Sequence, residues 1–375
     1  MKLAAVAAVS VMLCTPASTQ PILPVNEPAA RIAVVLADGR LQLYSGMADS
    51  LTREWTIAPF MLSGPEPQLE QSPDGRTLVL LAKPRFMEPG QSRLVSVDLR
   101  TMRLTSRVLT GAFANSGAFA LHPQTGALFL VGYDAVGVWV AEFDAKQLAP
   151  KRRWIALPVN TGVDSSSRIM ASLGPRWRAY GATIDPATQT MIVSFHGGVD
   201  GAELIRLDGN PTVRCPAATP TSSCIGQHGD VVSRPSGLFT ATGSQIVRFF
   251  GRDSTRREID TGLPGNHLMQ FMVDRDDAAV LAVGSCFFGR GFSMTAVSSS
   301  ATDPPLLRLP QVCGESISAD LDERWIVVTR LRGSMTLSRG PGSLRFVSLP
   351  SGETIREREV PGPPIDVLVL RPYGR

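Results

Sequence analysis

The stretch QLEQSPDGRTLVLLAK, which runs from Gln68 to Lys83, decides the fold. Its Ser-Pro-Asp-Gly core predicts a turn, because proline presets φ while aspartate and glycine bend the chain after it. A run of β-forming residues follows the turn, and RLVSVDL, Arg93 to Leu99, then alternates apolar with polar positions. Alternation with period two is typical of a half-buried strand. The segment therefore predicts strand, turn, strand, loop and strand, with LTSRVLT from Leu104 as a fourth strand.

This order of strands and turns recurs along the chain. The prolines of the turns, or the residues at equivalent positions, are Pro73, Pro123, Pro186, Pro235, Arg275 and Leu321. Successive positions are 50, 63, 49, 40 and 46 residues apart. A period near 50 residues with four strands in each unit is typical of propeller blades. A helical solenoid is excluded, because the sequence has no sustained apolar stripe with a period of 3.6 residues.

The two ends of the chain complement each other. RIAVVLADGRLQLYS, Arg31 to Ser45, and the following LTREWTIAP supply the outer strands of a blade that lacks its first strand, and PPIDVLVLRPYGR at the C-terminus has the pattern of that strand. We therefore expect an all-β, seven-bladed β-propeller over residues 31–375. Each blade is expected to have four antiparallel strands, and one composite blade pairs the N- and C-terminal strands. Two β-sandwich domains would also space strands regularly, but no linker or shift in composition divides the chain.

The sequence SPDGR, followed by LVLL, then VSVDL and a turn into another strand, resembles the YVTN-type repeat of seven-bladed propellers. That group includes lactonase-like proteins and the propeller subunits of quinoprotein amine dehydrogenases. The resemblance extends from about Arg31 to Tyr373, and it is close in the second blade and poor in the fifth and sixth. It implies an architecture, and function does not follow from architecture alone.

The first 20 residues have the pattern of a secretory signal, with a basic residue, an apolar run and small residues around a cleavage point after Ala17. The apolar run from Leu3 to Leu13 spans about 11 residues, too short for a membrane-spanning helix. We therefore expect a cleaved signal over residues 1–20, a linker over residues 21–30, and an exported protein, periplasmic or extracellular, without membrane insertion. Lipidation of Cys14 stays open, since Leu13 is larger than the residue that lipidation signals place before the cysteine.

Four cysteines follow the signal: Cys215, Cys224, Cys286 and Cys313. An even number in an exported chain permits two disulfides, and the pairs Cys215–Cys224 and Cys286–Cys313 are one arrangement that would close short loops. The pairing itself stays open. The cysteines form no C-x-x-C motif, so zinc-ribbon, thioredoxin-like and c-type haem sites lack their residues.

Charge and motifs exclude several functions. The net charge of +4 is spread along the chain, and no basic cluster of the length that nucleic-acid binding needs is present. The sequence also lacks a G-x-S-x-G elbow, an H-E-x-x-H motif, a P-loop and a G-x-G-x-x-G between a strand and a helix. We therefore expect no nucleic-acid partner, no resident metal and no bound cofactor. The oligomeric state stays open.

In a propeller, the turns between first and second strands lie on one face, here called the turn face. The opposite face, here called the loop face, carries the loops that lead into first strands and those between second and third strands. His122 is expected in a turn with a structural role. Three histidines on the loop face are candidate general bases: His196, His228 and His267. The carboxylates of Asp200 and Asp230 are expected near them. Three arginines on the same face suit an anionic ligand: Arg85, Arg290 and Arg332. Separate loop residues with local bonds remain the alternative.

These observations favour an exported propeller that binds a protein or a small anionic molecule on its loop face. A lactonase-like hydrolase is the alternative that the resemblance implies, with His196, His228 or His267 as general base and Arg290 beside the developing oxyanion. A third hypothesis is a non-catalytic propeller subunit of a quinoprotein dehydrogenase. Whether the protein is an enzyme stays open at this stage.

Overall fold

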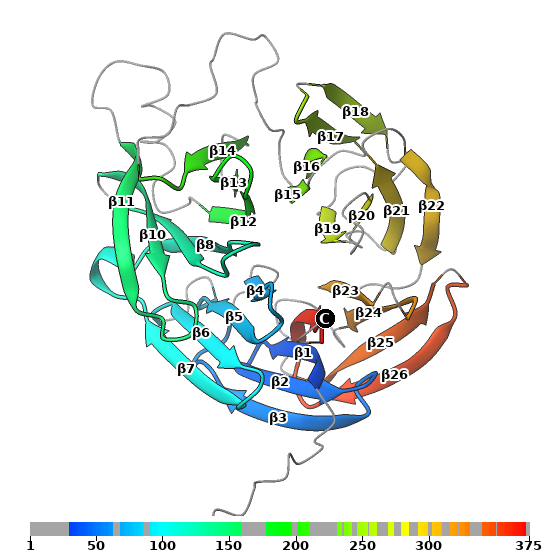
Figure 1. The fold of residues 1–375 in the computed structure, drawn as a ribbon. Helices are drawn as coiled ribbons and strands as arrows, with labels where there is room; N and C mark the ends of the chain where they lie inside the picture. Colours follow the sequence, from blue (N-terminus) through cyan, green and yellow to red (C-terminus); the bar gives the residue numbers. More distant parts are fainter. Residues whose placement is uncertain are drawn as a thin grey trace, which may run out of the picture.

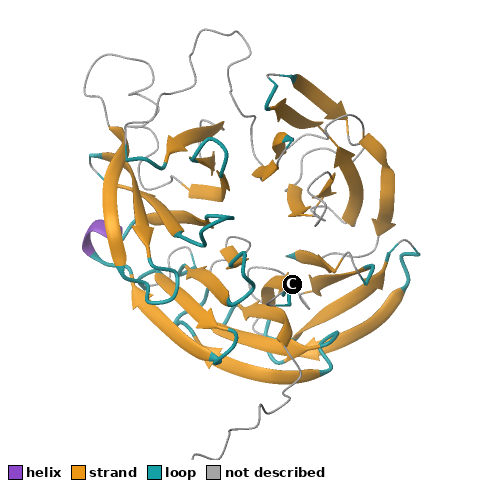
Figure 2. Cartoon of the chain, viewed as in Figure 1, coloured by secondary structure: helices purple, strands orange, loops and turns teal. Residues whose placement is uncertain are grey.

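The computed structural model describes residues 30–62, 68–85, 90–134, 136–158, 178–196, 201–209, 231–234, 236–241, 246–253, 255–260, 269–273, 279–284, 292–298, 302–309, 316–320, 323–330, 340–349 and 351–372. Within these residues, seven antiparallel sheets are arranged in a ring (Figure 1). Strands dominate, and the one described helix is a single 3-10 turn, Gly111–Phe113, much shorter than a bilayer is thick (Figure 2). The predicted seven-bladed propeller is therefore confirmed.

The composite blade closes the ring. Its strands lie in the order β27-β1-β2-β3, with bounds Pro364–Val369, Ala30–Leu36, Arg40–Ser45 and Ser50–Thr56. The C-terminal strand β27 pairs antiparallel with β1, with Val367 opposite Val34. As the sequence predicted, the last strand of the chain becomes the innermost strand of the first blade. This pairing covers an edge that both ends of the chain would otherwise expose.

The second, third and seventh blades each have four strands. The second blade consists of β4 Gln68–Gln71, β5 Thr77–Ala82, β6 Arg93–Asp98 and β7 Arg103–Val108. The third consists of β8 Ser116–Leu121, β9 Leu128–Tyr133, β10 Gly137–Phe143 and β11 Pro150–Pro158. The seventh consists of β23 Ile317–Asp320, β24 Trp325–Arg330, β25 Gly342–Ser348 and β26 Thr354–Val360. Gln68 to Lys83 thus contains the inner two strands of the second blade.

The remaining blades follow the same order. The fourth consists of β12 Arg178–Asp185, β13 Thr190–His196 and β14 Gly201–Arg206. Residues 210–230, which follow these three strands, lie outside the described residues. The fifth consists of β15 Val231–Arg234, β16 Gly237–Ala241, β17 Ile246–Gly251 and β18 Arg256–Asp260. The sixth consists of β19 Met269–Val273, β20 Ala279–Gly284, β21 Phe292–Ser298 and β22 Thr302–Leu309.

The core lies between blades. Successive side chains of a strand point to opposite faces of its sheet, and both faces of a blade are covered by neighbouring blades. In β1, Ala33 and Val35 pack against the second blade, whereas Val34 packs against the seventh. Trp139 and Trp325 are almost fully buried between blades. The four interfaces from the seventh blade through the composite, second and third blades to the fourth each contain a buried apolar cluster, so burial of apolar surface holds these blades together.

Neighbouring inner strands are also joined by hydrogen bonds from side chains to backbone. The Leu121 N–H donates to Glu70 Oε2 over 2.9 Å, linking the second and third blades. The Val369 N–H donates to Ser318 Oγ over 2.9 Å, linking the composite and seventh blades. On the other side of the composite blade, the Gln71 amide and the Arg371 backbone exchange two bonds of 2.7 and 2.9 Å. These contacts satisfy polar backbone groups on the inner edges of the sheets.

Candidate functional site

The Ser-Pro-Asp-Gly turn is a network of hydrogen bonds within itself. Ser72 Oγ accepts the N–H of Thr77 over 2.9 Å, and the Ser72 N–H donates to the Thr77 carbonyl over 2.7 Å. Asp74 accepts from Ser72 Oγ and from the Arg76 N–H, and the bond from Ser72 is the main cause that lowers the pKa of Asp74. Gly75 has a φ of +71°, a conformation that glycine adopts without strain. The Ser-Pro-Asp-Gly motif therefore stabilises the turn between β4 and β5.

Other side chains take the place of Ser72 in other blades. His122 Nδ1 accepts the backbone N–H groups of Gln124 and Thr125 at 3.2 and 3.3 Å. Asp185 Oδ1 accepts from the N–H of Ala187 at 3.1 Å, and Asp320 Oδ1 accepts from that of Glu323 at 3.0 Å. Each of the four side chains offers an acceptor to an N–H group of its turn. Ser72 accepts from a residue five positions on, whereas the histidine and the two aspartates accept from residues two or three positions on. The predicted structural role of His122, which is buried, is confirmed.

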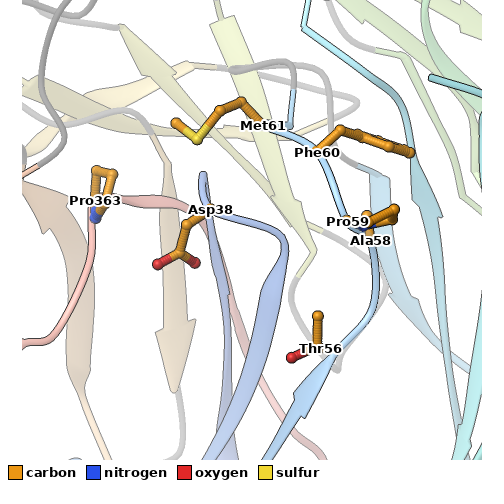
Figure 3. A pocket seen from close by; sticks show the side chains of 7 residues that line it. All are labelled: Asp38, Thr56, Ala58, Pro59, Phe60, Met61 and Pro363. Carbon is orange, nitrogen blue, oxygen red and sulfur yellow. The ribbon is translucent and has the colours of Figure 1, made fainter. Parts of the chain in front are cut away.

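The loop face carries a pocket of about 430 Å³ over the composite blade. Its lining is mostly apolar, with a single carboxylate among the described residues: Asp38, Thr56, Ala58, Pro59, Phe60, Met61 and Pro363. Phe60 and Met61 project from the segment that connects β3 to the second blade, and Asp38 and Pro363 lie across from them (Figure 3). The pocket therefore combines residues from both ends of the chain, separated by about 300 positions.

Local sequence explains how the walls of the pocket are held. The backbone of Gly39 accepts the N–H groups of Ile57 and Ala58 at 2.8 and 3.2 Å, so the β1–β2 turn is tied to the end of β3. Gly39 has a φ of +82°, and a Cβ there would collide with the carbonyl oxygen of Ala58. A Cβ at Gly90 would come within 2.8 Å of the Phe60 ring. Glycine at both positions lets the backbone approach closely enough to form the pocket.

The connection that carries Phe60 is also fixed at its ends. The Leu62 N–H donates to the Ala37 carbonyl over 2.7 Å, and the Ala37 N–H donates to that of Pro363 over 2.8 Å. Leu62 forms an isolated β-bridge with Pro84, and the Arg85 N–H donates to the Met61 carbonyl over 2.8 Å. The segment is therefore anchored to both the composite and the second blade.

The one acidic group of the pocket is paired with a cation. Arg40 donates to Asp38 through Nε, at 3.1 and 3.0 Å to the two carboxylate oxygens, and through Nη2 at 2.6 Å. Arg40 Nη1 also donates to Glu54 over 3.2 Å. The hydrogen bond to Asp38 is the main cause that raises the pKa of Arg40. These two carboxylates and one guanidinium carry a net charge of −1 beside the apolar surface.

Of the residues predicted for the site, Arg85 and His196 lie in the described part of the chain. Arg85 lies on the loop face, after β5, and its backbone borders the pocket segment. His196 ends β13, opposite Arg178, and so also reaches the loop face. The other candidates lie outside the described residues: Asp200, Asp230, His228, His267, Arg290, Arg332, Cys215, Cys224, Cys286 and Cys313. Their clustering and the disulfides stay predictions.

Sequence reasoning did not select Phe60 or Met61. The available signal was the apolar run APFML, Ala58 to Leu62, placed in a connection between blades instead of in a strand. Ala58 and Leu62 of this run are buried in the core between the composite and second blades, and Phe60 and Met61 pack against that core from the side of the pocket. Within the described residues, no three His, Cys, Asp or Glu side chains are grouped as a metal site would require.

Comparison with solved structures agrees with the architecture. The chain is similar to a structure described as "Dihydro-heme d1 dehydrogenase NirN in complex with DHE", with 15% identity, a TM-score of 0.53, and coverage of 94% of this chain and 78% of that one. It is also similar to the β-propeller domain of Cps50 (Swd1) from Myceliophteria thermophila, with 14% identity, a TM-score of 0.52, and coverage of 80% and 88%. The chain is a β-propeller. At such identities the likeness concerns the fold alone.

No family model and no curated protein sequence matches the chain. The YVTN-type repeat therefore stays a resemblance carried by the Ser-Pro-Asp-Gly turn and its strands. The β-propeller fold, by contrast, rests on the sheet order and on the solved structures together.

Proposed function

We propose that this β-propeller is an exported binding module that holds a protein partner on its loop face. The pocket beside Phe60 receives an apolar side chain of that partner. The observation that carries the proposal is the apolar lining of the pocket on a face built of loops. Export rests on the signal-like pattern of the first 20 residues.

The chemistry of the pocket favours an apolar anchor. Protein interfaces concentrate their binding energy in a few large side chains that fill well-shaped pockets, surrounded by a polar rim. Phe60, Met61 and the two prolines supply the apolar surface, and Arg40 with its two carboxylates supplies a polar border. An arrangement of this kind suits a leucine, phenylalanine or methionine from another chain.

A small anionic ligand fits this pocket less well. None of the described lining residues is a cation, and Asp38 would repel an anion. The guanidinium of Arg40 already donates to Asp38 and Glu54. Among the two ligand classes that the sequence favoured, the described part of the loop face therefore supports the protein partner.

The scaffold holds the pocket in one geometry before a partner arrives. The connection that carries Phe60 is bonded to the composite and second blades, and Pro363 is fixed by its bond with Ala37. A preformed surface avoids the entropy cost of ordering loops on binding. In other rigid β scaffolds, too, the strands fix the position of the loops and the loops bind the partner.

The proposal can be tested with the mature chain carrying photoreactive benzoylphenylalanine at Phe60, irradiated in the exported fraction of the cells that make the protein. Arg100 is the matched control, because it is exposed and lies on the turn face, where Leu99 donates to Arg76. We expect a defined cross-linked protein from position 60 and none from position 100.

The affinity of Phe60 and Arg100 variants for the cross-linked partner then tests the proposal. Phe60→Ala is expected to weaken binding at least tenfold, since anchor side chains contribute about 2 kcal/mol or more, whereas Arg100→Ala leaves affinity unchanged. Equal cross-linking from both positions, or full affinity of Phe60→Ala, would contradict the proposal.

A further inference from the structure

One wall of the pocket carries a carboxylate in otherwise apolar surroundings. Asp38 lies in the turn between β1 and β2, across the pocket from Phe60 and Met61 (Figure 3). Its side chain is 35% exposed, and the other described residues of the lining carry no charge. A group that enters this volume of about 430 Å³ therefore meets a negative charge beside an apolar surface.

Arg40 holds Asp38 in place without cancelling the negative charge of this border. Its Nε donates to both oxygens of Asp38 at 3.1 and 3.0 Å, and its Nη2 donates to Asp38 Oδ2 over 2.6 Å and to the Pro361 carbonyl over 3.2 Å. Nη1 donates to Glu54 Oε2 over 3.2 Å. All three nitrogens are thus engaged. Because one guanidinium serves two carboxylates, the three side chains keep one negative charge in excess.

Glu54 is fixed from the buried side of the blade. Gln42, which is fully buried, donates to Glu54 Oε2 through its Nε2. Its own Oε1 accepts the hydroxyl of Tyr44 over 2.7 Å. The bonds from Arg40 and Gln42 both go to Oε2, so Glu54 Oε1 accepts none within the described part of the chain, and the side chain is 35% exposed. The border therefore presents acceptors that buried side chains orient and that stay partly exposed.

The opposite border of the pocket, on the second blade, is basic. Lys83 and Arg85 flank Pro84, which forms a β-bridge with Leu62, and both cations already have partners within the chain. The charge across the pocket thus changes from positive at the second blade to negative at the composite blade. Complementary charges orient a ligand at an interface, so a cationic group is directed to the side of Asp38.

We propose that the pocket selects a segment in which a large apolar residue has a lysine or arginine within two positions. The apolar side chain lies beside Phe60, and the cation lies against Asp38. This inference rests on the proposed binding of a protein partner and names the chemistry of the segment that the partner supplies. Neighbouring Cα atoms are about 3.8 Å apart, so one short segment reaches both the apolar wall and the carboxylate of the same pocket.

The two contacts have different consequences. The apolar anchor supplies most of the affinity, because its burial removes apolar surface from water. The charge pair adds less affinity, because both of its groups stay partly exposed. It decides instead which segment binds, since a cation beside the anchor speeds association and an acidic neighbour is repelled.

Selection of a phage-displayed library of random nonapeptides on the full mature chain tests the inference. Peptides that also bind Phe60→Ala are removed, so the remaining peptides use the pocket. Among them, we expect lysine or arginine within two positions of a large apolar residue about three times as often as in the unselected library, or more. Aspartate and glutamate are expected to be depleted at the same positions.

Two variants that each remove one negative charge assign this preference to the border of the pocket. Selection on Asp38→Asn is expected to keep the apolar residue and to lose the enrichment of basic residues. Glu353→Gln is the matched control, because Glu353 is exposed in the turn between β25 and β26, on the turn face. Selection on this variant is expected to give the same basic enrichment as the unmodified protein.

One selected peptide, synthesised with its basic residue and with glutamine in its place, gives a second measurement on the unmodified protein. We expect the glutamine peptide to associate about three times more slowly or less at about 50 mM salt. The difference is expected to shrink at about 500 mM salt, because salt screens exposed charges.

The outcomes separate this inference from the proposed function. Peptides that depend on Phe60 without any basic enrichment would overturn the inference and leave the apolar anchor in place, and this result needs no variant of Asp38. A basic enrichment that persists on Asp38→Asn would also overturn it. If no selected peptide depended on Phe60, both the inference and the proposed use of the pocket would be wrong.

Discussion

The two faces of the propeller differ in the side chains that they carry: polar groups bonded to the backbone on the turn face, and apolar groups around a pocket on the loop face. On the turn face, the acceptors of Ser72, His122, Asp185 and Asp320 are directed at N–H groups of their own turns. On the loop face, the segment around Phe60 places apolar side chains around an open pocket. The conspicuous repeat motif therefore maintains the fold, and the irregular connection offers the surface for binding.

The difference follows from what each face must accomplish. A tight turn leaves backbone donors without a strand partner, so in the second, third, fourth and seventh blades a polar side chain stands at the same place in the turn. The longer connections of the loop face satisfy their backbone through neighbouring segments, as Leu62 does with Ala37 and Arg85 with Met61. Their side chains are then free to vary between blades.

The largest effect is expected from removing β27, the strand that closes the ring. A chain that ends at Pro363 lacks β27, which pairs with β1 and contacts the seventh and second blades. We expect loss of cooperative unfolding and of soluble protein, since the composite blade then exposes an apolar inner edge. Circular dichroism during thermal unfolding measures this. A chain that lacks only residues 373–375 is the control, and normal unfolding of the long truncation would refute ring closure by β27.

A matched pair of glycines compares the pocket with a turn. Gly39→Ala places a side chain at positive φ and against the Ala58 carbonyl, so we expect a loss of about 2 to 3 kcal/mol in unfolding free energy. Gly126→Ala has a similar φ of +67°, but the nearest atom, of Pro73, is 3.9 Å away. Strain alone then costs about 1 to 2 kcal/mol. Urea unfolding measures the loss of unfolding free energy in each variant. Equal losses would mean that the close approach of the β1–β2 turn to Ala58 does not require glycine at position 39.

A smaller effect is expected from the turn motif. Ser72→Ala removes the acceptor of the buried Thr77 N–H, which costs about 1 to 3 kcal/mol of stability. Ser72→Asp should recover only part of it, because the aspartates of other blades accept N–H groups two or three residues on and not five, as Ser72 does. Both variants are expected to bind the partner normally once folded. If Ser72→Ala weakened binding while its unfolding curve stayed unchanged, the assignment of the turn to structure would be wrong.

The smallest effect on stability is expected from Phe60→Ala, whose side chain lines an open pocket and is half-buried. We expect a decrease of about 1 kcal/mol or less, below the 3 to 5 kcal/mol typical of a buried phenylalanine. Urea unfolding beside the binding measurement provides the check. A loss as large as that of a core residue would show that Phe60 supports the fold more than a contact surface.

The fold was predictable from the sequence because its signals are local and repeated. Ser72 to Gly75 marks a turn by residue type, and the alternation after it marks strands. Even ring closure was predictable, because the apolar residues from Pro364 to Val369 match the strand that the N-terminal blade lacks. The periodicity of a strand survives in any context where one face is buried.

The pocket was not predictable in the same way. Asp38, Phe60 and Pro363 meet only after the ring has closed, and no spacing in the sequence encodes that contact. Asp366 looks like an ordinary polar position in an alternating strand, and its hydrogen bond from Ser316 of the seventh blade forms only when the ring closes. The predicted histidines and arginines were selected by residue type, and their proximity also depends on long-range geometry. His228, His267, Arg290 and Arg332 remain predictions.

The most direct test of the division between the faces is hydrogen–deuterium exchange of the protein with and without its cross-linked partner. We expect slower exchange in residues 56–62 and 361–365, which carry the pocket walls Phe60 and Pro363, and unchanged exchange in residues 72–77 of the turn. Slower exchange confined to residues 72–77 would place the partner on the turn face and would contradict the account.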